Sequence, residues 1–288
     1  MKSTIVKPII LAVLLLAASV DGALAWGSEG HAIVAEIAQR RLTPGAAKMV
    51  ERLLGRGHSL ASIASWADDV RDLRPGTKQW HFVDIPVDDN RYDPKTECKP
   101  SDQGDCVIAE LDRLRMRELR CAPGAKGKLE ALKFAVHFVG DIHQPLHSVA
   151  EEVGGNTIEV QVSVKGLKCR GTCQLKPFAS NFHAVWDTDL IQATVWDWGA
   201  YVDRLEVRWL KSAEARKRGI DGGTPLQWAL ETHAAAKSVW HRLSADHVID
   251  EAYYLDALPT LDRQLGVAGL RLARLLNDAY GSNKCHAK

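Results

Sequence analysis

One stretch decides how the rest of this chain is interpreted: HFVGDIHQPLH, residues 137–147. It follows an apolar run that predicts a buried helix. His137 and Asp141 are four residues apart, so on a helix they share one face. His147 lies just past Pro145, where the helix should end or bend. Imidazole and carboxylate groups on one face of a buried helix are typical metal ligands, and this combination suits zinc.

A buried histidine is more often a hydrogen-bonded core residue than a metal ligand, so one histidine alone indicates little. Here three histidines and one aspartate fall within eleven residues, which favours a site. The spacing then occurs a second time, in HAVWD at residues 183–187, where His183 and Asp187 again share one helical face. Two copies of a metal-ligand pattern, both set among apolar residues, predict a metal centre.

Residues 1–25 are typical of a secretory signal peptide. Two lysines form a basic start, residues 9–18 an apolar middle, and residues 23–25 (ALA) a small-residue cleavage site. The apolar run is too short for a membrane helix. We therefore predict an exported, periplasmic or secreted protein that begins at Trp26, does not associate with membranes, and forms one domain over residues 26–288.

Removing the signal segment leaves equal numbers of basic and acidic side chains, 35 of each. A neutral chain has no general field for polyanions, so a nucleic-acid substrate would have to be held by a local site. Six cysteines in an exported chain predict disulfide bonds. Cys98 with Cys106, and Cys169 with Cys173, are spaced to close short loops, although six cysteines allow fifteen pairings.

Hydrophobic periodicity and capping signals predict a mainly α-helical domain. The expected helices are residues 30–42, 44–54, 60–70, 106–120, 128–142, 181–191, 198–211, 225–243 and 258–280. Thr43 is the expected N-cap of the second helix. The fourth helix is amphipathic, and its many charges indicate a solvated outer face. Residues 157–164 alternate as a strand does and predict a small β-hairpin with residues 167–175. The polar segments 87–105 and 211–224 predict surface loops.

Several short motifs occur in a set order between the amino-terminal tryptophan and residue 187. They are Trp26-Gly27 with His31, Ser65-Trp66-Ala67-Asp68, His81-Phe82-Val83-Asp84, the stretch 137–147, Gly154-Gly155-Asn156, Asn181-Phe182-His183 and Trp186-Asp187. With these motifs the chain resembles the zinc-dependent single-strand nucleases and 3′-nucleotidases of fungi, plants and bacteria, the S1/P1 nuclease family. Each motif alone is weak, but the ordered set is specific. The resemblance implies a single-domain, mainly α-helical fold shared with the zinc phospholipases C.

The resemblance also implies three zinc ions and their ligands. One ion would take Asp68, His81, His137 and Asp141. A neighbouring ion would take His31, Asp141 and the free amine and carbonyl of Trp26, with Asp141 bridging the pair. The third would take His147, His183 and Asp187. The amine of Trp26 becomes a ligand only after the chain is cut just before that residue.

Further residues have implied roles in catalysis and substrate binding. Asp68 would orient the attacking water, and Arg71 would neutralise charge near the scissile phosphate. The alternative for these two is an exposed intrahelical ion pair. Asp84 matches a position that bonds a base edge, and Phe82 lies beside a base-stacking position. A structural carboxylate is an equal alternative for Asp84, and a turn role is an equal alternative to substrate contact for Asn156.

These features predict a zinc-dependent endonuclease that hydrolyses single-stranded DNA and RNA to 5′-phosphorylated products by a metal-activated water. Removal of 3′-phosphates from nucleotides is a further expected activity, and we expect a monomer. One alternative is a zinc phospholipase C on the same fold, although Asp84 suits a base better than a lipid headgroup. Another is a non-catalytic zinc-binding or nucleic-acid-binding module, which would need neither Asp68 nor Arg71 in its implied role.

Overall fold

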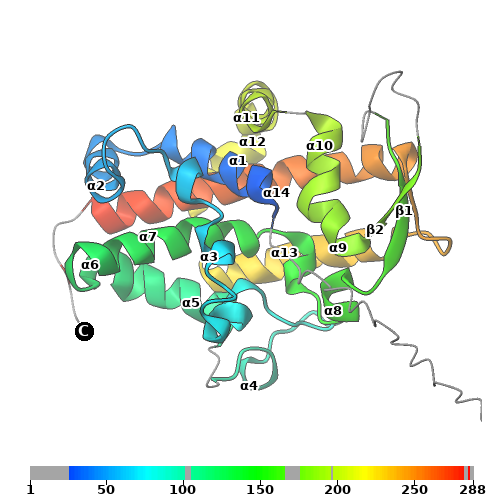
Figure 1. The fold of residues 1–288 in the computed structure, drawn as a ribbon, viewed down its shortest axis with the longest axis horizontal. Coiled ribbons are helices and arrows are strands. Elements are labelled where there is room, and N and C mark those ends of the chain that lie inside the picture. The colour runs from blue at the N-terminus through cyan, green and yellow to red at the C-terminus, as the bar shows by residue number, and fades with distance from the viewer. Residues whose placement is uncertain (1–25, 101–104, 166–175, 196, 282–284, 286–288) are drawn as a thin grey trace, which may run out of the picture.

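The computed structural model describes residues 26–100, 105–165, 176–195, 197–281 and 285. The chain is mainly α-helical, as the sequence predicts (Figure 1). The α-helices are α1 (Ser28–Gln39), α2 (Pro44–Leu54), α3 (Trp66–Asp69), α4 (Pro94–Glu97), α5 (Val107–Arg113), α6 (Leu119–Cys121), α7 (Gly124–Asp141), α8 (Glu152–Gly155), α9 (Phe182–Ala184), α10 (Leu190–Thr194), α11 (Trp198–Val207), α12 (Ala213–Asp221), α13 (Pro225–Trp240) and α14 (Glu251–Tyr280). Short 3₁₀ or π segments are η1 (Leu60–Ile63), η2 (Pro75–His81), η3 (Leu114–Glu118), η4 (Pro145–Ser148), η5 (Val185–Asp189) and η6 (Trp209–Lys211). The strands are β1 (Glu159–Ser163), β2 (Phe178–Asn181) and β3 (Val248–Asp250).

The centre of the molecule is formed by α1, α7 and α14, which pack against one another (Figure 1). The 30 residues of α14 span about 45 Å at 1.5 Å per residue. Ile33 and Ile37 of α1 are fully buried, which stabilises the fold by about 1.5–3 kcal/mol each. Gly269 of α14 allows close packing, because a Cβ there would lie 2.5 Å from Ile37 Cβ. Because α1 is held this tightly, the position of its His31 is fixed by the core.

Most expected helices are present, with shifted ends. The side chain of Thr43 caps α2 by accepting a backbone N–H of the first turn, which confirms that prediction. Helix α14 begins at Glu251 rather than at residue 258 and continues through Pro259. Proline favours the first turn of a helix, so the sequence pattern placed the start too late. Among the described helices, none has the length and apolar character needed to cross a membrane.

Three expected segments are wrong in their extent or continuity. Residues 211–224 are not a loop throughout, since they contain α12, whose sequence is too polar to show a clear apolar period. The helix expected over residues 60–70 is divided into η1 and α3. The amphipathic helix expected over residues 106–120 is present, but η3 interrupts it between α5 and α6; Leu111 and Leu114 form its buried side against the core. A charged sequence can therefore still supply one buried stripe.

A small sheet closes one end of the molecule, with strand order β2-β1-β3 (Figure 1). The strand expected over residues 157–164 is confirmed as β1, which pairs antiparallel with β2 and places Val160 opposite Ser180. Its expected partner, residues 167–175, lies outside the described part of the chain. The third strand, β3, pairs parallel with β1 and comes from a distant segment. A hairpin pattern cannot predict such a partner, because parallel strands need a long connection.

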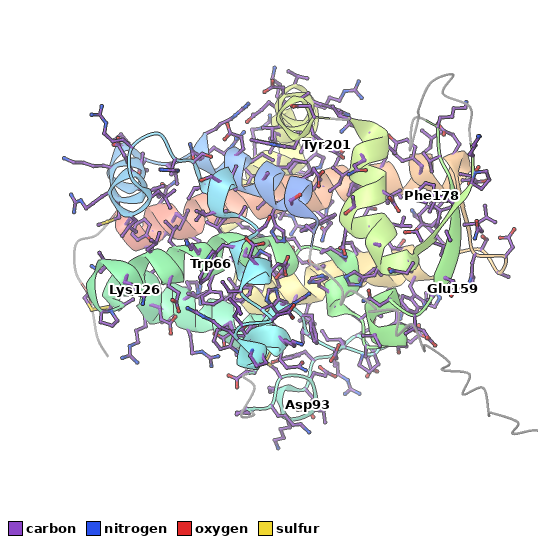
Figure 2. All side chains as sticks on the ribbon, in the orientation of Figure 1. Trp66, Asp93, Lys126, Glu159, Phe178 and Tyr201 are labelled. Carbon is purple, nitrogen blue, oxygen red and sulfur yellow. A yellow bond between two sulfur atoms is a disulfide. The ribbon has the colours of Figure 1, made fainter. Side chains whose placement is uncertain are left out.

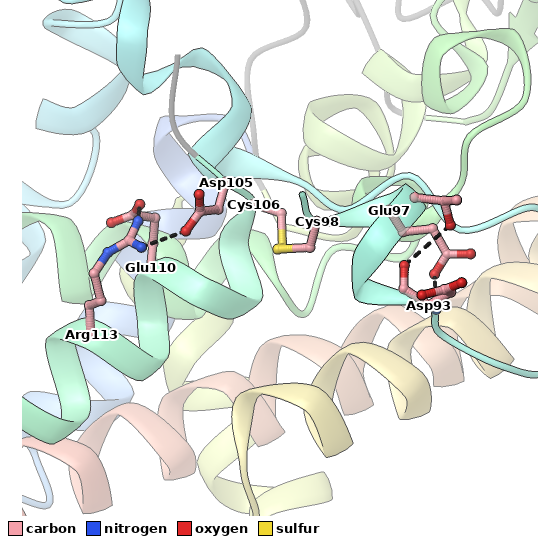
Figure 3. The surroundings of a disulfide bond; sticks show 8 residues. Asp93, Glu97, Cys98, Asp105, Cys106, Glu110 and Arg113 are labelled. Carbon is pink, nitrogen blue, oxygen red and sulfur yellow. Dashed lines mark hydrogen bonds and ion pairs between the residues drawn. A yellow bond between two sulfur atoms is a disulfide. The ribbon is translucent and has the colours of Figure 1, made fainter. Parts of the chain in front are cut away.

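Disulfide bonds join parts of the chain near α4 and α6. Cys98 and Cys106 are bonded, with Cα atoms 5.1 Å apart, which confirms one predicted pair (Figure 3). Cys121 is bonded to Cys285, with Cα atoms 5.3 Å apart, and ties α6 to the segment after α14. Local spacing could not indicate this bond, because 164 positions separate the two residues. The pair predicted within residues 169–173 lies outside the described residues.

The expected loop over residues 87–105 contains the single helical turn α4. Asp93 caps this turn by accepting the Lys95 N–H at 2.9 Å, and the Asp93 N–H donates to Glu97 at 2.8 Å (Figure 3). These are the reciprocal bonds by which short polar side chains stabilise helix starts. The Cys98–Cys106 bond then connects α4 directly to α5.

Candidate metal centre

Three groups of histidine and aspartate side chains lie in the described structure, and every member is a predicted metal ligand. Within each group the ligand atoms all lie within 4.8 Å of one another. The groups are His31, His137 and Asp141; Asp68, His81 and His137; and His147, His183 and Asp187. The fold therefore brings together side chains from segments that are far apart in the sequence.

The second group forms where α3 and η2 meet α7. His137 and Asp141 lie one turn apart on the buried side of α7, as their spacing predicts. Trp66 of α3 is labelled in Figure 2. Its ring packs edge-on against Phe134 of α7, with ring centroids 5.2 Å apart, and so holds α3 in place. This packing positions Asp68 beside the two α7 side chains.

Four predicted ligand atoms, the three of this group and Asp141 Oδ2, surround one point. His81 Nδ1 lies 3.0 Å from Asp141 Oδ2 and 3.6 Å from Asp68 Oδ1. His137 Nε2 lies 3.1 Å from His81 Nδ1 and 3.2 Å from Asp141 Oδ2. It also lies 3.5 Å from Asp68 Oδ1. In a tetrahedral zinc site with ligands at about 2.0–2.1 Å, neighbouring ligand atoms are about 3.3–3.4 Å apart. The four side chains have this spacing.

Asp141 also faces His31. His31 Nε2 lies 3.3 Å from Asp141 Oδ1, so the two oxygens of this carboxylate serve two groups. Neither ring nitrogen of His31 makes a hydrogen bond within the described structure, although the residue is fully buried. The imidazole lies against Gly140, where a Cβ would be 2.6 Å from His31 Nδ1. Trp26, also fully buried, lies against the same glycine and is therefore close to His31.

The third group comes from η4, α9 and η5. His183 Nε2 lies 3.5 Å from Asp187 Oδ2, and the ring centroids of His147 and His183 are 5.0 Å apart. Asp187 Oδ1 accepts a hydrogen bond from Gln144 Nε2 at 2.6 Å. Burial raises the pKa of Asp187 well above its ordinary value, so its carboxylate needs a positive partner to remain ionised. The Gly27 N–H donates to the Asp187 carbonyl at 2.9 Å and connects the start of α1 to this group.

Backbone carbonyls orient three of the histidines. Each of the three donates its Nδ1–H to a carbonyl, which leaves the lone pair of the neutral imidazole on Nε2. The pairs are His137 with Ala64 at 2.7 Å, His147 with His81 at 2.9 Å, and His183 with Gly154 at 2.7 Å. Gly154 has a φ of 63°, and a Cβ there would lie 2.7 Å from the Leu146 carbonyl. The predicted Gly-Gly-Asn turn is therefore needed to hold one of these carbonyls.

The charges of the first two groups favour a bound cation. Burial lowers the pKa of His31 to about 4 and that of His183, in the third group, to about 3, so both imidazoles are neutral at pH 7. Burial alone would raise the pKa values of Asp68 and Asp141. The charge of His137 outweighs it and brings Asp68 to about 2 and Asp141 well below its ordinary pKa. Burial alone would lower the pKa of His137, but the negative charges of Asp141 and Asp68 outweigh that effect and raise it well above its ordinary value. With its pKa raised in this way, His137 carries a proton in the absence of metal, and a metal ion can take the place of that proton between the two carboxylates.

A pocket with about 400 Å³ of empty space opens beside the second and third groups, since His81, His147 and His183 line it. Its walls are formed by Arg71, His81, Phe82, Asp84, Leu146, His147, Val149, Val153, Gly154, Asn156 and His183. All the residues predicted to contact substrate are in this list. The wall therefore combines three histidines predicted as metal ligands with apolar side chains, and a mostly apolar pocket with a few polar groups is typical of a small-molecule binding site.

The polar residues of the pocket differ in their surroundings. Arg71 Nη1 lies 3.7 Å from Asp68 Oδ1, and both side chains are largely buried, so they are not an exposed surface pair. Asp84 keeps part of its surface exposed, yet burial of the rest raises its pKa to about 6. Asn156 donates from Nδ2 to the Val153 carbonyl at 2.7 Å, which gives it a role in the turn as well as a place in the pocket wall.

Some residues of the site were not evident from the sequence. Gln144 was not predicted to act, although its position among the ligands is a signal, and it is buried against Asp187. His143 belongs to none of the three groups, since it donates to the Val139 carbonyl at 2.7 Å and accepts from Arg271 at 2.9 Å. Backbone carbonyl partners leave no sequence signal, because every residue has a carbonyl.

Comparison with known proteins adds a family to this geometry. A family model described as S1/P1 nuclease matches residues 26–281. The chain is 31% identical to nuclease PA3 of a Penicillium species and 31% identical to nuclease P1 of Penicillium citrinum. Each of these matches covers 89% of this chain and 98% of the relative. It is 30% identical to endonuclease 2 of Arabidopsis thaliana, over 89% of this chain and 91% of that protein.

Proposed function

The chain belongs to the S1/P1 nuclease family, and we propose that it is an exported zinc-dependent phosphodiesterase acting on single-stranded DNA and RNA. Residues 1–25 are its signal peptide and residues 26–288 its nuclease domain. It releases 5′-phosphorylated products and removes 3′-phosphates from nucleotides at the same site. One observation carries the proposal: buried histidine and aspartate ligand atoms, several without hydrogen bonds, converge beside a pocket that contains Arg71.

The donor atoms present fit zinc. Buried polar atoms normally find a hydrogen-bond partner, yet His31 Nδ1 and Nε2, Asp68 Oδ1, Asp141 Oδ1 and His183 Nε2 have none within the described structure. Nitrogen and oxygen donors at tetrahedral spacing are the set that zinc prefers. The proposed ligands are Asp68, His81, His137 and Asp141 for one ion; His31, Asp141 and the amine and carbonyl of Trp26 for a second; and His147, His183 and Asp187 for a third.

Bound zinc supplies Lewis-acid chemistry, which lowers the pKa of water and offsets charge on phosphoryl oxygens. The residues of the chain supply orientation. Asp68 accepts a hydrogen bond from the attacking water and directs its lone pair toward phosphorus. Arg71 lies one turn further along and presents its guanidinium to the pocket, where its planar fork matches two phosphate oxygens. Both residues act best in a buried site, where electrostatic interactions are least screened by water.

The pocket explains a preference for single strands. Phe82, Leu146 and Val153 give it apolar surfaces, and Asp84 adds an acceptor that can bond the amino or imino group of a base. A base must leave its stack to enter a pocket of this kind while its phosphate reaches the ligand groups. A stacked duplex offers neither, so unpaired strands are the expected substrates.

The first experiment measures zinc content and cleavage on the same sample of chain beginning at Trp26. We expect three zinc ions per chain and digestion of single-stranded DNA and RNA that stops on chelation and returns with zinc. Three zinc ions without cleavage, but with hydrolysis of phosphatidylcholine, would support the phospholipase alternative instead. One zinc ion or none in an active protein would contradict the proposed ligand set.

A pair of neighbouring aspartates provides a matched control for catalysis. Asp68 belongs to the second group and lies 3.5 Å from His137 Nε2, whereas Asp69 is exposed. We expect Asp68→Asn to lower kcat by about 100-fold or more, since it removes both a ligand charge and the group that orients water. Asp69→Asn makes the same chemical change one residue away and should stay within about twofold of the wild type. Equal activity of the two variants would exclude the proposed role of Asp68.

A further inference from the structure

A second cavity lies away from the ligand groups, between η3, α6, α13 and α14. It has about 530 Å³ of empty space and shares no described wall residue with the pocket beside the ligand groups. Four arginine side chains line it, and they are Arg115, Arg120, Arg271 and Arg274. Helices α6 and α14 approach each other at the end of the molecule where the described chain finishes (Figure 1).

Three of these arginines have an unused donor. The Nε–H groups of Arg115, Arg120 and Arg271 are buried and make no hydrogen bond within the described structure. Arg271 is only 4% exposed, so its donor cannot be satisfied by bulk water. Buried charged donors normally have a hydrogen-bond partner, because an unpaired one has lost its hydration without compensation. An anion bound in this cavity could accept hydrogen bonds from several of these arginines at once.

The charged side chains in the wall of the cavity favour a bound anion. Among its described wall residues, Asp278 carries the one carboxylate, and it lies 3.6 Å from Arg274 Nε. Glu231 also bonds Arg271, but it is shared with Arg218 outside the wall. The wall thus keeps a surplus of positive charge. Guanidinium groups match the oxygens of phosphate in geometry as well as in charge.

The surroundings of the cavity are rigid. Trp228 donates from Nε1 to the Gly222 carbonyl at 2.6 Å and lies against the Arg271 guanidinium, 5.4 Å from ring centroid to Cζ. A Cβ at Gly222 would lie 2.7 Å from Arg274 Nε, so the backbone approaches that side chain closely. Trp228 is 3% exposed and offers no free face for stacking a base. The ligand is therefore held by its phosphoryl oxygens rather than by a base.

We propose that this cavity is a second anion site, which binds a phosphoryl group as inorganic phosphate or as the phosphate of a mononucleotide. Arg271 connects it to the ligand segment, because its Nη1 donates to His143 Nε2 at 2.9 Å. His143 lies between Asp141 and His147 in the chain, so this buried contact joins the arginine cavity to the segment that carries two of the proposed ligands. The site needs no nuclease activity and is tested separately from the proposed function.

The test is calorimetric titration of metal-loaded protein with inorganic phosphate. The variant R115Q/R120Q removes two donors whose side chains are partly exposed, which limits damage to the fold. The control R52Q/R56Q removes the same charge from exposed positions on and just after α2. Phosphate bound at the metal groups should be unchanged in all three proteins. A second class of binding should be present in the wild type and the control and at least about tenfold weaker in R115Q/R120Q.

Identical titrations of all three proteins would overturn the proposal. Repeating the titrations with a 5′-mononucleotide separates the two ligand sources. Tighter arginine-dependent binding of the nucleotide identifies a nucleotide site, and tighter binding of phosphate identifies a free-phosphate site. If R115Q/R120Q does not fold, wild-type crystals soaked in selenate give a second measurement. Anomalous density within hydrogen-bond distance of Arg271 Nε supports the site, and its absence at saturating selenate refutes it.

Discussion

Replacing Gln144 with leucine should remove one metal ion and leave the others. The Gln144 amide donates to Asp187 Oδ1 at 2.6 Å, and it touches a proposed ligand of the third ion alone. A hydrogen bond to a charged group contributes about 1.5–3 kcal/mol, which corresponds to roughly 10–100-fold in affinity for the third ion. Leucine has a similar volume, but it also removes the Gln144 Oε1 that accepts the Leu146 N–H and caps η4, the segment that carries His147 of the same third group. Metal analysis after dialysis against buffered, limiting zinc should therefore fall from three ions to two.

The matched control is Gln264→Leu, which makes the same change at another buried glutamine. Gln264 donates to the His143 carbonyl at 2.8 Å and to Thr232 Oγ1 at 3.1 Å, but it contacts no proposed ligand. It should lose thermal stability and keep three ions. If Gln144→Leu also keeps three ions at limiting zinc, or if both variants lose the same ion, the hydrogen bond to Asp187 does not tune the third site.

Three further predictions concern the chain start, a raised pKa and the disulfide bonds. A chain that keeps two or three residues before Trp26 should bind one zinc ion fewer and lose most activity, because its amine is then a peptide nitrogen; equal metal content and activity in both forms would refute this. The pKa of Asp84 is raised to about 6, so the folded state holds its proton more tightly than the unfolded state, and stability is lost as pH rises from about 4 to 6. The Tm of Asp84→Asn minus that of the wild type should therefore increase over this range, and a decrease would contradict the raised pKa. Cys121→Ser should cost roughly 5 kcal/mol of unfolding free energy and Cys98→Ser roughly 2.5 kcal/mol in the chain-entropy model, since the loops closed are 164 and 8 positions long; chemical denaturation that gives the reverse order would exclude loop entropy as the main term.

The two predicted His–Asp ligand pairs could be anticipated because helix geometry is local: one lies within α7, and the other runs from α9 directly into η5. His137 with Asp141, and His183 with Asp187, are four apart, and a helix of 3.6 residues per turn places such pairs on one face. The structure has both pairs within 3.5 Å. The amphipathic character of α12 was not predictable in the same way, since its polar sequence carries too few apolar residues to show a period.

Contacts between segments depended on the tertiary structure. The approach of His31 to Asp141 requires α1 to lie against α7, and that arrangement depends on packing around Gly140. The pairing of Cys121 with Cys285 depends in the same way on α6 lying beside the end of α14. No sequence spacing encodes either contact, because each is set by the summed packing of many side chains.

By itself, the sequence determined a mainly helical chain, a metal-ligand pattern repeated on two helical segments and, by resemblance, a nuclease family. These are properties of short segments, where a few torsion angles decide which side chains are neighbours. Only the tertiary structure decided that Asp141 faces two groups, that Gln144 holds Asp187, and that three unpaired arginine donors meet in a second cavity. Those relations arise between elements, where hydrophobic burial selects one packing and thereby fixes which polar atoms meet.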